Sequence, residues 1–327
     1  MRLLIENRSL PKGYYVGDLL SGITKAIKEK YPQHEYIPHK REQFASKGNG
    51  GVYSATNLII TNEENGLYIL FGTHYNWKQY FSTSSGWKPE NMVKWFYTSG
   101  FNYLDYFNFT AKHSEVKFPK DITKTYQQIY YGPFMNKDMG LMTELYKNRN
   151  PTKQKMIFRG WLQDFRKKMV VGIKDNKEID IFDVRDPNAN KSSKLSYELY
   201  LKDMSDYTCS LSLPGATEIC NRDIESFGIG LPVIRPLLHT KYENPLIPNF
   251  HYISCYEDCK YWNGTPYYPS FKEVGEYAAV YWNMVKNNEE YLNFISENAR
   301  NWYLENTSLD NHLKYIMSKL DLEILNV

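Results

Sequence analysis

The sequence lacks any long apolar run. None of its 327 residues falls in a stretch of about 18 consecutive apolar residues, the length that a helix needs to cross a bilayer. The first residues, MRLLIENRSLPKGYY, also lack the apolar core of about 7–15 residues that a secretory signal peptide carries. We therefore predict a cytoplasmic protein without a membrane span.

Paired cysteines and a strong net charge are also missing. The four cysteines, Cys209, Cys220, Cys255 and Cys259, form no CxxC pair, and no second ligand pair follows the last two. A zinc site is therefore not expected, and free buried thiols in a reducing compartment fit better. The formal charge of +3 is too small to indicate a nucleic-acid partner, which calls for a clustered basic face.

What the sequence does contain is typical of a globular protein. Hydrophobic residues make up 42% and charged residues 24%, and 327 residues suffice for two domains with separate cores. The 29 tyrosines are many. Their rings could stack on sugars, but an AT-rich coding sequence would enrich tyrosine as well.

The segment Ser205–Pro236 has the pattern of a strand, a loop, a helix and a second strand. An apolar run from Tyr207 to Leu213 predicts a buried strand, and Pro214-Gly215 predicts a turn. Ile219, Ile224 and Phe227 then recur at helical spacing, and an apolar run through Ile234 follows. This order predicts a parallel α/β sheet, whose ligands bind at the carboxyl ends of the strands.

Hydrophobic periodicity predicts further elements along the chain. Strands are expected at Asn57–Thr61 and Leu67–Phe71, as a hairpin, and at two later places, from Lys155 and within Ile173–Phe182. Helices are expected at Asp18–Tyr31, Trp87–Tyr97, Met135–Tyr146, Leu195–Met204, Phe271–Lys286, Glu289–Asn306 and Leu309–Leu320. The polar turn Lys147–Thr152 predicts a domain boundary.

The pattern G-x6-R-x2-E-x4-G-L-P-V-I, from Gly215 to Ile234, resembles the donor-binding half of GT-B glycosyltransferases. The resemblance spans roughly Lys155 to Pro236 and is strongest to family 90, the O-glucosyl- and O-xylosyltransferases, with exostosin-like enzymes behind it. It implies two Rossmann-like domains facing across a cleft. Residues 1–148 would form the acceptor domain, 149–300 the donor domain, and 301–327 a helix packing back on the first.

The resemblance also implies the reaction. The chain would transfer a sugar from a UDP-sugar, UDP-xylose or UDP-glucose, to a glycan or glycoprotein hydroxyl with inversion. No Asp-x-Asp motif is present to hold a metal on a diphosphate, so we expect no metal and no cofactor besides the nucleotide-sugar. Relatives in family 90 that enter the secretory lumen are eukaryotic, so a cytoplasmic chain suggests a bacterial or viral source.

The donor site is expected at strand ends and at the start of a helix. Arg159-Gly160 ends a predicted strand, and Arg222 begins the predicted helix, where its guanidinium could meet phosphate oxygens. An interdomain salt bridge is the alternative for Arg159. Glu225 could accept hydrogen bonds from a ribose diol or pair with Arg222. Further donor-site candidates are Arg166, Ser210, Ser212, Gly215 and Arg235.

The catalytic base is expected in the first domain. His74 and Asp105 are the candidates because aromatic residues that could hold a sugar flank both. Either could instead be structural, His74 as a buried histidine and Asp105 as a cap. Glu63, Glu64 and Asp121 stay open as alternatives. A non-catalytic carbohydrate-binding protein is the rival function, and a phosphorylase or epimerase of related fold is a second.

Overall fold

The structure is a computed structural model that describes residues 1–8, 15–38, 57–72, 91–98, 126–129, 139–184, 195–215, 218–239, 244–262 and 265–326. Contacts between residues divide the chain into two compact units. Unit 1 holds the described residues up to Ile129 and those from Thr307 onward, and unit 2 holds those from Met139 to Asn306.

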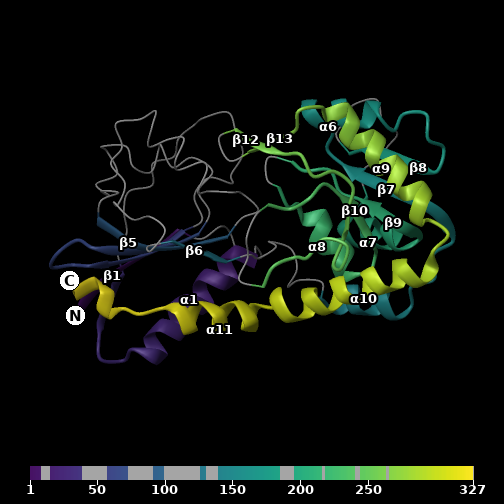
Figure 1. Cartoon of the computed structure of the whole chain (residues 1–327). Coiled ribbons are helices and arrows are strands. Elements are labelled where there is room, and N and C mark those ends of the chain that lie inside the picture. Colours follow the sequence, from purple (N-terminus) through teal and green to yellow (C-terminus); the bar gives the residue numbers. More distant parts are fainter. Residues whose placement is uncertain are drawn as a thin grey trace. The chain divides into compact units, whose positions relative to one another are not determined.

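Unit 1 is built on a mixed sheet of six described strands in the order β2-β1-β3-β4-β5-β6 (Figure 1). Its strands are β1 (Arg2–Arg8), β2 (Glu35–Pro38), β3 (Asn57–Asn62), β4 (Tyr68–Gly72), β5 (Met92–Thr98) and β6 (Tyr126–Ile129). Only β3 runs antiparallel to its neighbours, because it forms a hairpin with β4. The hairpin predicted from the sequence is confirmed, and the other pairs are parallel.

The helix expected at Trp87–Tyr97 is wrong where the structure describes this segment. Met92–Thr98 is strand β5, which pairs in parallel with β4 and β6. This segment is rich in Val, Trp, Phe, Tyr and Thr, residue types that favour β-strands. Phe96 is buried and stacks on Phe71 of β4, with ring centroids 4.9 Å apart.

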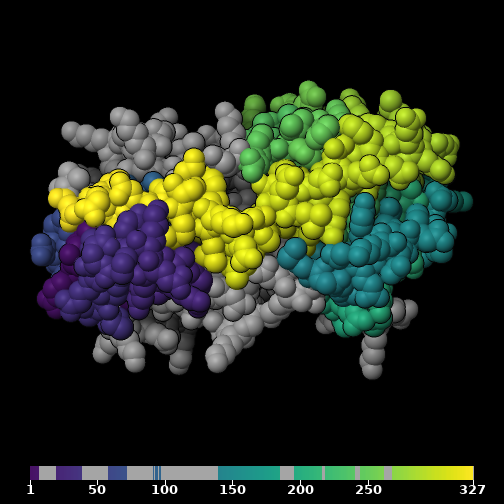
Figure 2. All heavy atoms as spheres, turned by 90° about the horizontal axis from the view of Figure 1, so that it is seen from below, coloured from purple at the N-terminus to yellow at the C-terminus, as the bar shows by residue number. Residues whose placement is uncertain are grey.

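Two helices from opposite ends of the sequence cover unit 1. Helix α1 (Tyr15–Lys30) buries Leu20, Ile23 and Ile27 and packs against α11 (Leu309–Lys319). Figure 2 shows the same contact as purple atoms against yellow atoms. A short 3-10 helix, Glu323–Asn326, follows α11.

The end of α11 is held by donors from unit 1. The ammonium of Lys30 donates to the carbonyl oxygens of Met317 (2.7 Å) and Leu320 (3.3 Å). The ammonium of Lys94 donates to the carbonyl of Lys319 at 2.6 Å. These cations satisfy carbonyls that a helix end leaves unpaired and complement the negative end of its dipole.

Unit 2 is built on a parallel sheet in the order β11-β10-β9-β7-β8. Its strands are β7 (Lys153–Gly160), β8 (Ile179–Asp183), β9 (Tyr207–Leu211), β10 (Val233–Arg235) and β11 (Ile253–Ser254). Counted within the unit, this is the order 5-4-3-1-2 of a doubly wound sheet, with its switch point between β7 and β9. The predicted parallel α/β sheet is confirmed.

Helices cover both faces of this sheet (Figure 1). They are α5 (Met139–Lys147), α6 (Asp164–Val171), α7 (Tyr197–Ser205), α8 (Asn221–Gly228), α9 (Phe271–Val285) and α10 (Glu289–Asn306). Helices α6 and α9 pack together and share a buried core with Phe158, Leu211 and Ile234 of the strands. Helix α8 packs against α5 and α10. A small antiparallel hairpin joins β12 (Lys260–Trp262) to β13 (Thr265–Tyr267).

Candidate functional site

The switch point of the unit 2 sheet brings two loops together at the carboxyl ends of the strands. Strand β7 leads into α6, and its neighbour β9 leads through residues 212–220 into α8. In open α/β sheets, ligands bind outside the carboxyl ends of the strands where such a change of direction occurs. Five of the nine predicted donor residues lie on these two strands and their loops, Arg166, Arg222 and Glu225 come from α6 and α8, and Arg235 ends β10.

Arg159 ends β7 with part of its guanidinium unpaired. The side chain is buried, and its Nη2 donates to Oδ2 of Asp203 on α7 at 2.7 Å. Its Cζ lies 4.0 Å from the ring centroid of Phe182. The Nε and Nη1 atoms are buried and have no partner among the described residues. The ion pair joins two elements of unit 2, and two further N–H positions remain for an acceptor.

Arg222, the second residue of α8, lies against the end of β7. Its Nε donates to the carbonyl oxygen of Arg159 at 2.9 Å, and its Cζ lies 4.1 Å from the ring centroid of Phe158. A Cβ at Gly160 would fall 1.9 Å from Nη2, so glycine makes room for this guanidinium. Its Nη1 is buried without a partner in the described part of the chain. The positive end of the α8 dipole lies close by.

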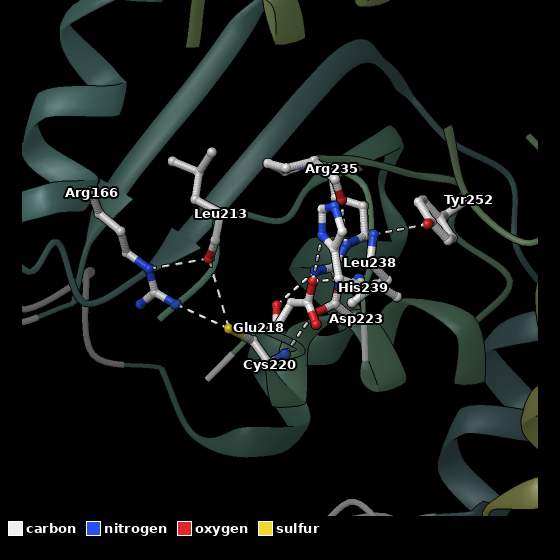
Figure 3. A network of polar contacts seen from close by, with 10 residues as sticks. Arg166, Leu213, Glu218, Cys220, Asp223, Arg235, Leu238, His239 and Tyr252 are labelled. Carbon is white, nitrogen blue, oxygen red and sulfur yellow. Dashed lines mark hydrogen bonds and ion pairs between the residues drawn. The ribbon is translucent and has the colours of Figure 1, made fainter. Parts of the chain in front are cut away.

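Arg166 uses its guanidinium to connect the two loops (Figure 3). Its Nε donates to the carbonyls of Leu213 (3.1 Å) and Pro214 (3.0 Å), and its Nη1 donates to the carbonyl of Trp161 at 2.9 Å. Its Nη2 contacts Sγ of Cys220 at 3.1 Å. Burial lowers the pKa of Arg166, and the nearby Cys220 raises it in part. The side chain therefore fixes the loop after β9 against the loop after β7.

Gly215 closes the same contact. A Cβ at this position would lie 2.7 Å from Nη2 of Arg166 and 3.5 Å from Sγ of Cys220. The predicted donor residue thus allows the close approach of Arg166, and it lies within the loop that Arg166 holds.

Arg235 is fully buried and structural in its contacts (Figure 3). Nη1 donates to Oδ1 of Asp223 at 2.7 Å, Nη2 to the carbonyl of Glu218 at 2.6 Å, and Nε to the carbonyl of Pro236 at 3.1 Å. Burial lowers the pKa of Arg235, but the charges of Asp223, Tyr252 and Glu218 together outweigh burial and the pKa is raised overall. The other carboxylate oxygen of Asp223 accepts from the backbone N–H of Cys220 at 2.7 Å.

The Arg235 network extends to the loop after β10. The carboxylate of Glu218 accepts from the backbone N–H of His239 at 2.5 Å and lies 3.3 Å from its Nδ1. This hydrogen bond raises the pKa of His239, and burial opposes it. Arg166 thus contacts the start of the β9–α8 loop, and the Arg235 network contacts the part of the loop next to α8.

Glu225 faces tyrosines of α7. The hydroxyl of Tyr200 donates to Oε2 of Glu225 at 2.7 Å. Burial raises the pKa of Glu225, while the Tyr200 hydrogen bond and the charge of Arg222 lower it in part. Both Arg222 and Glu225 are described, and they form no ion pair with each other. The alternative of an i,i+3 pair is therefore not what the structure shows.

Three buried hydroxyls on β9, its loop and α8 have no hydrogen-bond partner in the part of the chain that the structure describes. Ser210 and Ser212 alternate with core residues along β9 and its end, and their Oγ atoms are buried and unpaired within the described residues. Ser226 of α8 is in the same condition. Ser210 lies level with Ile157 of β7 and Val233 of β10. Unsatisfied buried groups call for an explanation, such as water or a ligand.

The sequence did not indicate Asp203, Phe158, Phe182 or Ser226. Asp203 is 44 residues from Arg159 in the sequence, and no local pattern links them. The two phenylalanines read as ordinary strand residues, although each lies beneath a guanidinium. A run of hydroxyls on one face of predicted elements could have drawn attention to Ser226.

Taken together, the site fits an anion. Arg159 and Arg222 present unpaired, buried N–H groups where β7 ends and α8 begins. Guanidinium groups bind phosphate oxygens well, and the amino end of a helix favours negative charge. Among the described residues, no group of three or more His, Cys, Asp or Glu side chains could hold a metal ion.

The predicted catalytic bases fall elsewhere. His74, Asp105 and Asp121 lie outside the described residues. Glu63 and Glu64 are exposed in the β3–β4 turn, where Oε2 of Glu63 pairs with Nη1 of Arg2 at 2.8 Å. No helix in the described ranges is long and apolar enough to span a membrane.

Comparisons with known proteins give distant structural likenesses. No family model matches the chain, and no curated protein matches it. A glycosyltransferase from Rickettsia africae is similar with a TM-score of 0.41 and 13% identity, over 95% of this chain and 82% of that one. Anabaena HepE, in complex with UDP and glucose, is similar with a TM-score of 0.41 and 9% identity, over 77% of this chain and 71% of that one.

A third solved structure is the pneumococcal O-GlcNAc transferase GtfA in complex with UDP and GlcNAc. Its TM-score is 0.40 with 13% identity, over 94% of this chain and 56% of that one. The Rickettsia protein is described as a glycosyltransferase and the pneumococcal protein as an O-GlcNAc transferase. At this level of similarity, they leave the function of this chain to be argued from its own site.

Proposed function

We propose that this chain is a glycosyltransferase that moves a sugar from a nucleotide-sugar to a hydroxyl of a glycan or glycoprotein. The observation that carries the proposal is the pair of arginines at the switch point of the unit 2 sheet. Arg159 and Arg222 keep buried N–H groups without partners among the described residues, and Arg222 also lies in the first turn of α8. A diphosphate supplies the several anionic oxygens that such groups need.

The two arginines would act most strongly as the bond to the sugar breaks. Negative charge then grows on the departing diphosphate, and fixed cations in a buried site stabilise that charge. Phe158, Phe182 and Asp203 hold the guanidinium groups in place before any ligand arrives. Arg166 and Arg235 would position the loop between β9 and α8 and would not touch the diphosphate.

The remaining details of the proposal come from the sequence. Resemblance to family 90 favours UDP-xylose or UDP-glucose, inversion, and no metal or cofactor besides the nucleotide-sugar. The first predicted domain, residues 1–148, would bind the acceptor, with His74 or Asp105 as the base. Ser210, Ser212 and Gly215 would line the donor site, and Glu225 would lie beside it.

A thermal-shift panel tests the proposal. The ligands are UDP, GDP, CMP and their sugars, added to the wild type and to Arg222→Gln. A ligand at a hundred times its Kd adds about 2.7 kcal/mol to the free energy of unfolding, which moves Tm by several degrees in a domain of this size. We expect one nucleotide family to raise Tm in the wild type and to lose that effect in Arg222→Gln.

Arg149→Gln is the matched control. Arg149 is a half-buried arginine of the same unit, but its Nη2 donates to the carbonyls of Tyr207 and Thr208, at the amino end of β9. This control should keep the full ligand shift relative to its own Tm. No shift with any nucleotide in the wild type would refute the proposal and would favour a carbohydrate-binding protein. Analysis of products separates transfer from phosphorolysis or epimerisation.

A further inference from the structure

An exposed tryptophan follows directly after the two residues that end β7. Trp161 is 41% exposed, whereas Trp282 and Trp302, two other tryptophans of unit 2, are 0% and 5% exposed. A single exposed apolar residue needs no explanation by itself. Trp161 differs because it comes two residues after Arg159 and one after Gly160, at the switch point of the sheet.

The backbone that carries this indole is fixed from several sides. The carbonyl oxygen of Trp161 accepts from Nη1 of Arg166 (2.9 Å) and from the N–H of Gln163 (3.2 Å). The next N–H, that of Leu162, donates to Oδ1 of Asp183 at 3.2 Å. These hydrogen bonds fix the backbone at Trp161, so a ligand that contacts the residue would lose little entropy in ordering that backbone.

Trp161 is also close to Arg159 along the backbone. Consecutive Cα atoms are about 3.8 Å apart, so the Cα of Trp161 is at most about 7 Å from that of Arg159. A nucleoside diphosphate bound by Arg159 and Arg222 would therefore lie close to the backbone that carries the indole. Its base is a flat ring, and bases stack on aromatic side chains whatever their hydrogen-bonding edge.

We infer that Trp161 is the stacking platform for the base of the nucleotide that binds at Arg159 and Arg222. This inference rests on the proposed function, because it needs a nucleotide in that site. Stacking would increase the affinity for a nucleotide but would discriminate little among the different bases. The loss on removing the indole should therefore be similar for uridine and guanosine diphosphates.

Isothermal titration of the full chain tests the inference with Trp161→Ala and Trp161→Phe. The ligands are UDP, GDP, the UDP-sugar that binds best, and pyrophosphate. We expect Trp161→Ala to weaken each nucleoside diphosphate that the wild type binds about tenfold or more, in line with the usual worth of base stacking. Trp161→Phe should recover most of that loss, and pyrophosphate should bind all three proteins equally.

Phe294→Ala provides the control. Phe294 is an aromatic residue of α10 with 43% exposure, comparable to that of Trp161, and it packs on Phe250 rather than at the strand ends. Its substitution should leave every affinity unchanged. Melting curves of each variant verify that the fold is intact, so a loss of binding cannot be ascribed to unfolding.

Four results would overturn the inference. An equal loss for pyrophosphate would make Trp161 a support of the phosphate site, and a loss confined to the UDP-sugar would make it a sugar contact. Unchanged affinities for UDP and GDP in Trp161→Ala would show that the indole does not contact the nucleotide, and the proposed function would still stand. If the wild type binds no nucleotide and no pyrophosphate, the proposed function and this inference fail together.

Discussion

The guanidinium of Arg222 occupies the space that a side chain at position 160 would need. A Cβ on Gly160 would lie 1.9 Å from Nη2 of Arg222 and 3.5 Å from the ring of Phe158. Glycine is thus required here by the close approach of another side chain. The placement of the Arg222 side chain therefore depends on glycine at position 160, although 62 positions separate the two residues along the chain.

Gly160→Ala should displace Arg222 while keeping the fold. The atom that meets the new methyl group is the far end of a flexible side chain, which can move. We expect an affinity for nucleoside diphosphate about tenfold lower, because a charge-assisted hydrogen bond is worth about 1.5–3 kcal/mol. Isothermal titration measures the change. Gly140→Ala is the control, since nothing lies within 4 Å of a Cβ there; equal binding by both variants would refute the coupling.

Asp203→Asn should destabilise unit 2 and loosen Arg159. Asp203 pairs with Nη2 of Arg159 (2.7 Å) and with Nζ of Lys153 (3.3 Å), and Arg159 is buried. Removing one partner of a mostly buried pair leaves a charge uncompensated, so we expect a loss of about 1–3 kcal/mol in the free energy of unfolding. Urea unfolding measures it.

A pair on the same helix supplies the control for Asp203→Asn. Glu198 and Lys202 form an exposed i,i+4 pair on α7, and such pairs contribute little. Glu198→Gln should leave the urea midpoint unchanged. If both variants shift the urea midpoint equally, the Arg159–Asp203 pair contributes no more to stability than the exposed pair does.

Asp223→Asn should cost more stability than Asp203→Asn. Asp223 and Arg235 are both fully buried, and the same carboxylate accepts from the N–H of Cys220 at the start of α8. Breaking a buried pair leaves the Arg235 charge without compensation, and such changes cost about 3–5 kcal/mol. Thermal and urea unfolding should agree on this loss. A change as small as that of Glu276→Gln, in the exposed pair with Lys272, would contradict it.

Acid should weaken the fold through His251. Burial lowers the pKa of His251 to about 4, and its Nδ1 accepts from the N–H of Ile247 at 2.8 Å, which a protonated ring could not do. Because the folded pKa lies below the unfolded value, the stabilisation is complete above about pH 6.5 and is lost as the pH falls toward 4. The total is at most roughly 3 kcal/mol.

Urea unfolding from pH 4 to pH 7 on the wild type and His251→Gln tests this. The difference between the two proteins should shrink as the pH falls, and a constant difference would contradict the prediction. His239→Gln is the opposite control. In the wild type, the hydrogen bond to Glu218 raises the pKa of His239. The contribution of His239 to the free energy of unfolding is therefore complete below about pH 6.5 and is lost at higher pH.

Local patterns predicted the elements of unit 2 well. The run Tyr207–Leu213, the Pro214-Gly215 turn and the periodic segment after it correspond to β9, its loop and α8. Strong periodicity and punctuating residues operate over short distances, so they can be read from the sequence. Strand β5 was missed because its aromatic residues also fit one face of a helix, and only pairing with β4 and β6 decides between the two.

The candidate site was predictable in place but not in detail. Strand ends and a helix start located Arg159 and Arg222 near one another. Which N–H groups stay unpaired depends on residues far away in the sequence, such as Asp203 for Arg159. The sequence likewise could not distinguish Arg235, whose contacts are all internal, from an arginine that faces a ligand.

The placement of α11 bears on how the chain acquires its structure during translation. The core of unit 1 includes Ile316, Leu320, Leu322 and Leu325, together with residues of β1 and α1. The described residues of unit 2 lie between these two contributions. A ribosome therefore delivers all of the described unit 2 before it delivers the last core residues of unit 1. Domains generally fold from the amino terminus onward during synthesis. Here unit 1 cannot complete its core until unit 2 has been synthesised, and until then part of the apolar surface of unit 1 stays uncovered.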